Sequence, residues 1–209
     1  MKKITTRQLV ESALMVAVAT VLSMIKPFDL TGLDFYGGGV TLVSMLPLIM
    51  VSHRYGWKWG AFTAFVYSVL QILLGMSNFT WLLSVYTELN LKGWEIALRI
   101  ALMALFDYVL AYTVIGLSGA FGKGYKAVAI GIAVTMSLRL LCHLVSGAVI
   151  WAPITDKLKV FNFVFTNPWL YSLVYNGKYM IPEIIITEIV AKLLYKPMKR
   201  FFEPDAVKK

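Results

Sequence analysis

The sequence predicts an all-α integral membrane protein, a bundle of six transmembrane helices. Of its 209 residues, 59% are hydrophobic and only 15% are charged. The mean hydropathy of +0.72 also exceeds what a soluble globular domain shows. Two stretches, 35–53 and 59–76, contain no Asp, Glu, Lys or Arg, and each approaches the roughly 20 residues that a helix needs to cross the hydrocarbon layer. These observations place the chain in a membrane.

The other expected spans are apolar segments with few charges. The first tolerates Glu11 if that residue sits near the membrane interface, and the fourth and fifth contain one charge each, Asp107 and Arg139. The sixth carries Glu183 and Glu188 and is the least apolar. We expect one membrane domain over 1–209, with spans at 5–25, 36–53, 59–76, 96–121, 127–151 and 179–195.

The net charge is +9, and the distribution of the basic residues is explained by membrane topology rather than by a nucleic-acid-binding surface. Excess Lys and Arg occur in alternate segments: 1–7, 53–58, 122–126 and 196–209. The intervening loops, 26–39, 77–94 and 152–167, are nearly charge-balanced. The positive-inside rule therefore places both termini in the cytoplasm of a multi-pass protein of the cell membrane, surrounded by lipid and without a nucleic-acid partner.

The sequence lacks the motifs of a motor or an enzyme. The stretch GAFGKGYK (119–126) has the wrong glycine spacing for a nucleotide-binding loop, and neither HExxH nor GxSxG occurs. A single cysteine, Cys142, excludes an internal disulfide, and its two distant histidine companions, His53 and His143, make a zinc site improbable. We expect neither catalysis nor a metal or other cofactor.

One polar cluster lies on the expected fifth span. Arg139 and His143 are four residues apart and share a helix face, while Trp151 lies about two turns beyond His143. Taken alone, His143 is equally well a hydrogen-bonded interior residue, and Trp151 an interfacial anchor.

A second cluster precedes the sixth span and favours a binding site. Tyr171, Tyr175 and Tyr179 recur every four residues, so they form one aromatic stripe if this part is helical. Asn176 lies beside the stripe, and Gly177 is expected to allow close approach. An interfacial aromatic belt does not need an asparagine.

Asp107, followed by Tyr108, completes the set. A carboxylate within a span marks a functional site or an ion pair, and the structural alternative is a bridge to Arg139. Otherwise Asp107 faces a ligand. One carboxylate, several aromatic rings and amide or imidazole groups suit a small organic cation that has a flat heteroaromatic ring.

Four blocks of the chain also carry a family resemblance. They are GGGVTLVSMLPLIMVSHRYGWKWG (37–60), FDYVLAYTVIGLSGAFGK (106–123), the His-x7-Trp of CHLVSGAVIW (142–151) and WLYSLVYNGKYMIPEIIIT (169–187). In this order they resemble the thiamine-specific S component of energy-coupling factor (ECF) transporters, the ThiT family. The resemblance implies a six-helix protein that binds thiamine near its extracellular side. It also implies a separate module of one transmembrane coupling subunit and two ATPase subunits, which would supply the missing motor.

The resemblance carries ligand roles onto matching positions: Asp107, Tyr108, His143, Trp151, Tyr171 and Asn176. Arg139 and Tyr175 join this set through the faces that they share with His143 and Tyr171. The family also uses an aromatic residue in the first extracellular loop. Because this chain has no Trp there, Phe35 or Tyr36 is expected to substitute.

Two further features have less defined roles. The segment 152–168 is longer than the family pattern and is a candidate lid. Ala13 and Ala17 have small-xxx-small spacing, which lets another helix approach closely. The resemblance implies a contact with the coupling subunit at this pair, whereas spacing alone equally favours packing within the chain.

Other functions remain open from the residues alone. An S component for another vitamin or precursor, such as a pyrimidine or pyridoxine-like compound, would use the same architecture. A proton-coupled secondary carrier would use Asp107, Glu183 and Glu188 as protonation sites, although the chain shows no internal repeat of the kind found in many such carriers.

Overall fold

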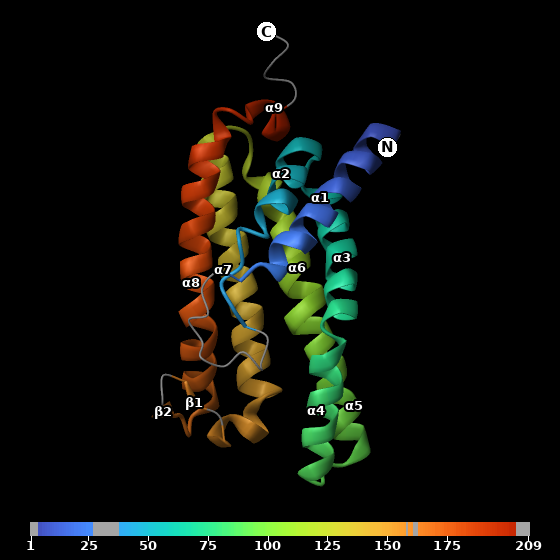
Figure 1. Ribbon diagram of the computed structural model, residues 1–209, viewed down its shortest axis with the longest axis vertical. Helices are drawn as coiled ribbons and strands as arrows, with labels where there is room; N and C mark the ends of the chain where they lie inside the picture. Colours follow the sequence, from blue (N-terminus) through green and yellow to red (C-terminus); the bar gives the residue numbers. More distant parts are fainter. Residues whose placement is uncertain (1–3, 27–37, 158, 161–162, 204–209) are drawn as a thin grey trace.

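The computed structural model describes residues 4–26, 38–157, 159–160 and 163–203. Figure 1 shows an elongated helical bundle with the start of α1 and the short α9 at one end, and with the α4–α5 turn and a small β-hairpin at the other. The elements are α1 (Thr6–Met24), α2 (Leu46–Tyr55), α3 (Trp57–Leu74), α4 (Met76–Glu88), α5 (Gly93–Met103), η1 (Ala104–Leu110), α6 (Ala111–Thr113), η2 (Val114–Phe121), α7 (Tyr125–Val149), η3 (Ala152–Lys157), β1 (Lys159–Val160), β2 (Phe163–Val164), α8 (Pro168–Tyr195) and α9 (Lys199–Phe202).

The first helix closely matches the expected span. Thr5 caps α1, because its hydroxyl accepts a hydrogen bond from the Gln8 amide at 3.2 Å. Glu11 pairs with Arg7 at 2.7 Å and with Arg54 of α2 at 2.6 Å. The Glu11–Arg54 pair joins α1 to α2 at the end of the bundle where α9 also lies (Figure 1).

The helix expected over 36–53 is wrong in extent. Residues 38–45 are not helical, and Val43 adopts a positive φ of 56°, which interrupts any regular helix. Helix α2 begins only at Leu46, with Pro47 in its first turn, where proline favours helix initiation. Its ten residues rise about 15 Å, half of a hydrocarbon layer.

The helix expected over 59–76 corresponds to α3, but the chain stays helical beyond it. After α3 the chain bends by 57° and continues as α4, through a stretch that we expected to be a loop. Gly75 lies at the bend, and a side chain at this position would overlap the Tyr108 hydroxyl. The glycine therefore lets the bent helix pair close onto the π-helical segment η1.

The fourth expected span is confirmed as one helical run with irregular geometry. Between α5 and α6 the backbone forms the π-helix η1, which carries Asp107 and Tyr108, and the run ends in the 3-10 helix η2. Short π-helical insertions occur frequently at functional sites because they rotate side chains out of the regular helical register.

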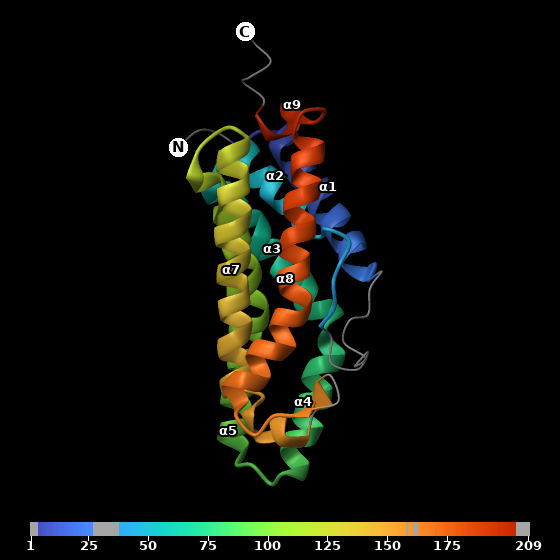
Figure 2. The ribbon, with the colours of Figure 1, turned by 90° about the vertical axis from the view of Figure 1, so that its left-hand side faces the viewer.

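Helices α7 and α8 lie side by side along the bundle (Figures 1 and 2). Their close approach occurs at Gly147, where a Cβ would overlap Ser172. It does not occur at Gly177, where a Cβ would make only an ordinary 3.6 Å contact with Ile181, so that expectation is wrong. Gly147 thus brings the start of α8 against the end of α7.

Helix α8 begins well before the expected residue 179. The Asn167 side chain accepts hydrogen bonds from the amides of Trp169 and Leu170, at 2.9 and 3.3 Å, and Pro168 occupies the first turn. This cap and proline start the helix early enough to include the whole tyrosine stripe.

Three of the six expected membrane spans coincide with helices that are long and apolar enough to cross a membrane. Among the described residues, three helical runs are long and apolar enough to span: α1, Gly93–Phe121 and α7. The bent pair α3 and α4 makes a fourth. Helix α2 is too short to span as a helix, and α8 has 28 residues but carries four charged side chains. The count of six stays a prediction.

A close backbone contact between α3 and η2 predicts a stability test. Gly116 of η2 lies directly against the backbone of Gly60 in α3, so a Cβ there would overlap main-chain atoms that cannot rotate away. Gly116→Ala should destabilise the protein by roughly 1–3 kcal/mol, the usual range for overpacking. Thermal unfolding in detergent measures this. The matched control is Gly93→Ala, because a Cβ there meets nothing within 4 Å; equal stability of the two variants would contradict the prediction.

Candidate functional site

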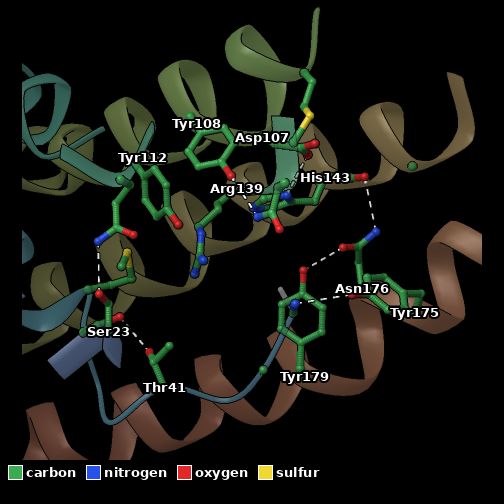
Figure 3. A pocket seen from close by; sticks show the side chains of 18 of the residues that line it. Ser23, Thr41, Asp107, Tyr108, Tyr112, Arg139, His143, Tyr175, Asn176 and Tyr179 are labelled. Atoms are coloured by element: carbon green, nitrogen blue, oxygen red, sulfur yellow. Dashed lines mark hydrogen bonds and ion pairs between the residues drawn. The ribbon is translucent and has the colours of Figure 1, made fainter. Parts of the chain in front are cut away.

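A cavity of about 190 Å³ lies among α3, η1, α7, α8 and the segment 38–45 (Figure 3). Most of its lining is aromatic or polar. The lining residues are Ser23, Lys26, Gly38, Gly39, Thr41, Ser44, Met45, Tyr67, Gln71, Asn78, Met103, Asp107, Tyr108, Tyr112, Arg139, His143, Gly147, Trp151, Tyr171, Tyr175, Asn176 and Tyr179. All eight described ligand candidates from the sequence therefore face one cavity.

Asp107 is the centre of the polar network at one side of this cavity. Its Oδ1 lies 3.0 Å from His143 Nδ1, and its Oδ2 accepts hydrogen bonds from Ser146 Oγ at 2.6 Å and Trp151 Nε1 at 3.4 Å. All three partners come from the end of α7 and the residues that follow it. The π-helix turns the carboxylate toward α7, and α7 holds it there.

The contact with Asp107 selects the tautomer of a neutral His143 ring. A carboxylate only accepts hydrogen bonds, so His143 Nδ1 carries the proton that points to Asp107. His143 Nε2 is buried and has no hydrogen-bond partner among the described residues. In the neutral ring this nitrogen is an acceptor, which suits a donor group on a ligand.

The tyrosines of α8 form the aromatic stripe that their spacing predicts. Tyr171 and Tyr175 stack with ring centroids 5.7 Å apart and an interplanar angle of 9°. Tyr175 meets Tyr179 edge to face at 5.8 Å. Together they form an aromatic wall for a flat ring.

Asn176 joins the two long helices beside this wall. Its Nδ2 donates to the His143 carbonyl at 3.3 Å and to the Ser172 carbonyl at 3.0 Å, and its Oδ1 accepts from the Tyr179 hydroxyl at 2.7 Å. Only 5% of this residue is exposed. Asn176 therefore orients both the tyrosine stripe and the turn of α7 that carries His143.

Helix α4 contributes residues that the sequence did not reveal. Asn78 donates to the Tyr108 hydroxyl at 3.2 Å, and Phe79 packs on the Tyr108 ring at 5.3 Å. Trp81 stacks on Trp151 with centroids 5.8 Å apart. The sequence contains these residues as an Asn-Phe-x-Trp run, but the interpretation of 77–94 as a loop kept them out of the candidate set.

The proposed structural bridge between Asp107 and Arg139 is wrong. Arg139 Nη1 instead pairs with Glu183 Oε2 of α8 at 3.1 Å, and its guanidinium lies 5.1 Å from the centre of the Tyr112 ring. Glu183 lies on α8, which packs along α7, and it is level with Arg139 along the helix pair. Asp107 is thus not needed to neutralise the arginine.

The remaining candidates are placed as follows. Phe35 and Tyr36 lie outside the described residues. Ala13 and Ala17 are exposed on α1 and line a groove against α3, whereas Ser12 and the residues on its side of α1 are buried. The role of the alanine pair stays a prediction.

The segment expected as a lid is described only in part. It contains the 3-10 helix η3 and the antiparallel pair β1 and β2, in which Lys159 faces Val164. Figure 1 places this hairpin at the end of the bundle opposite α9. A lid role for 152–168 stays a prediction.

The fold is that of a multi-pass, all-helical membrane protein with a cavity between its helices. The family described as "Thiamine transporter protein (Thia_YuaJ)" matches residues 9–203. Because this match covers nearly the whole chain, the protein belongs to that family, which is a family of transporters and not of enzymes.

Individual relatives agree with this assignment. The chain is 28% identical over 211 residues to the thiamine transporter ThiT of Bacillus subtilis, which covers 95% of both chains. It is 24% identical to the thiamine transporter ThiT of Lacticaseibacillus paracasei over 76% of this chain and 74% of the relative. The structure of ThiT from Listeria monocytogenes has a TM-score of 0.67 at 20% identity, and the match covers 94% of this chain and 97% of that one. This last likeness shows the fold.

The pairing of Arg139 predicts which residues are coupled in the ligand-free protein. Arg139→Leu and Glu183→Leu should each cost about 3–5 kcal/mol, because each strands a buried charge, and the double variant should cost less than their sum. Asp107→Asn combined with Arg139→Leu should be additive to within about 0.5 kcal/mol. SDS titration in mixed micelles measures the free energies of unfolding. Rescue of Asp107→Asn by Arg139→Leu would contradict the assignment.

Proposed function

We propose that this protein is the substrate-binding membrane subunit of an ECF-type ABC transporter for thiamine uptake. It binds thiamine from the extracellular side and relies on a separate ATPase module for transport. The observation that carries the proposal is the Asp107 network beside the aromatic wall, in a member of a thiamine transporter family.

The chemistry of the cavity suits thiamine. Thiamine combines a permanently cationic thiazolium ring with an aminopyrimidine ring. The Asp107 carboxylate supplies a negative charge, and the rings of Trp151, Tyr171 and Tyr175 supply stacking and cation–π surfaces. The open Nε2 of His143 can accept a hydrogen bond from an amino group. A neutral pyridoxine-like compound would leave the carboxylate charge without a cationic partner.

The arrangement of the ends supports cytoplasmic termini. The start of α1 and α9 lie at the same end of the bundle (Figure 1), and α9 carries the basic residues Lys199 and Arg200. Arg54 pairs with Glu11 and donates to the Arg200 carbonyl at 2.6 Å. By the positive-inside rule this end faces the cytoplasm.

The exposed face of α1 favours contact with a partner helix in the membrane. Ala13 and Ala17 are small and exposed, so a helix of the transmembrane coupling subunit can approach them closely. Two ATPase subunits would complete the assembly, because this chain has no nucleotide-binding motif.

The purified chain alone should bind thiamine. Because Trp151 lines the cavity and stacks on Trp81, thiamine should quench the tryptophan fluorescence in a saturable way. Pyridoxine at the same concentration is the control and should leave the fluorescence unchanged. No quenching and no calorimetric heat with thiamine would refute the proposal. Accumulation of thiamine by proteoliposomes that hold only this protein and a proton gradient would favour a secondary carrier instead.

Variants of the cavity should lose affinity without losing the fold. Trp151→Ala and His143→Ala should each weaken thiamine binding about tenfold or more, through lost stacking and hydrogen bonding. Asp107→Asn should cost about 2–5 kcal/mol of binding free energy, because it removes a desolvated charge. Calorimetry measures the affinities, and thermal unfolding without ligand checks the fold. Trp94→Ala is the control, since Trp94 is 64% exposed on α5; an equal loss of affinity there would contradict the assignment.

A further inference from the structure

The segment 38–45 forms one wall of the cavity without being helical. Its backbone is tied to α1, because the Leu42 amide donates to the Ile25 carbonyl at 3.1 Å. Near its start it meets α8, because the Gly38 amide donates to the Tyr175 hydroxyl at 3.3 Å. A side chain at Gly38 would come within 2.7 Å of the Tyr179 ring, so the backbone itself touches the tyrosine stripe.

A second contact to α8 passes through Thr41. The Thr41 hydroxyl donates to Glu183 Oε1, and Thr41 Oγ1 also lies 2.6 Å from Ser44 Oγ. Figure 3 shows Thr41 on this segment, beside the cavity and on the same side as Tyr179. Thr41 and Ser44 line the cavity, whereas Glu183 does not.

Glu183 divides its two carboxylate oxygens between two elements. Oε2 pairs with Arg139 of α7, and Oε1 accepts from Thr41 of the segment. Glu183 is 1% exposed and Arg139 is 5% exposed. Removed from water, an ionised carboxylate of this kind makes a charge-assisted hydrogen bond, which is about twice as strong as a neutral one.

We propose that Glu183, neutralised by Arg139, is a positioning residue that holds the segment 38–45 against the cavity through the Thr41 hydroxyl, and so slows the departure of bound ligand. In this arrangement the Arg139–Glu183 ion pair stays fixed, because it joins two long packed helices. The Thr41 hydrogen bond is the part that breaks when the segment moves. The choice of thiamine as the ligand probe rests on the proposed function.

Substitutions at Thr41 separate this role from general packing. Thr41→Val keeps the shape of the side chain but removes the donor, and the Arg139–Glu183 pair stays intact. Thr41→Ser keeps the donor. The matched control is Thr187→Val, the same chemical change one turn along α8 from Glu183, at a buried hydroxyl that has no hydrogen-bond partner among the described residues.

Two measurements on the full-length protein test the proposal. Stopped-flow tryptophan fluorescence gives the dissociation rate of thiamine, which should rise about tenfold or more in Thr41→Val, the factor expected for losing one hydrogen bond to a charged group. Hydrogen–deuterium exchange of the backbone amides in 38–45, without ligand, should also become faster in that variant. Thr41→Ser and Thr187→Val should resemble the unchanged protein in both measurements.

The outcomes are distinct. An unchanged dissociation rate in Thr41→Val, or an equal rise in Thr187→Val, would overturn the proposal. If the unchanged protein does not bind thiamine, the proposed function fails. The hydrogen–deuterium exchange of 38–45 then decides by itself whether Glu183 and Thr41 position the segment. Faster exchange in Thr41→Val but not in Thr41→Ser would then still support the positioning role, and unchanged exchange would refute it.

Discussion

A charge buried in the membrane interior costs several kcal/mol unless a partner compensates for it, and this constraint determines how the helices meet. Arg139 on α7 is compensated by Glu183 on α8. In the part of the chain that the structure describes, the partners of Asp107 on η1 are the side chains of His143, Ser146 and Trp151. Arg139 and Asp107, which both line the cavity, therefore do not pair with each other. The proposal of a cationic ligand rests on this arrangement, in which Asp107 lines the cavity without an arginine partner.

Close backbone contacts make these pairings possible. Without a side chain at Gly147, α7 and α8 approach until Asn176 reaches the His143 carbonyl. Likewise, the lack of a side chain at Gly75 lets the Tyr108 hydroxyl lie against the bend between α3 and α4. In a membrane, small residues at helix contacts supply the packing that the hydrophobic effect supplies in water. The positions of the ligand candidates thus depend on residues that need not touch a ligand themselves.

The irregular backbone of this protein is concentrated around the cavity. The π-helix η1 and the non-helical segment 38–45 line it, and Gly75 at the bend lies against Tyr108, which also lines it. Lipid cannot satisfy exposed backbone groups, so irregular backbone at this depth is tolerated only where protein or a cavity surrounds it. The long helices α7 and α8 form one side of the site, and these irregular segments form the other.

The sequence by itself determined properties that depend on local composition and helical period. Hydropathy identified a membrane protein and the approximate positions of α1, α3 and α7, and the four-residue spacing put Tyr171, Tyr175 and Tyr179 on one face. It could not assign the partner of Arg139, because periodicity reports which face a residue occupies and not which side chain lies at the same depth on another helix. The continuation into α4, the late start of α2 and the close approach at Gly147 were likewise decided by the tertiary structure. Each depends on which backbone packs against which, and that information is spread over segments far apart in the chain.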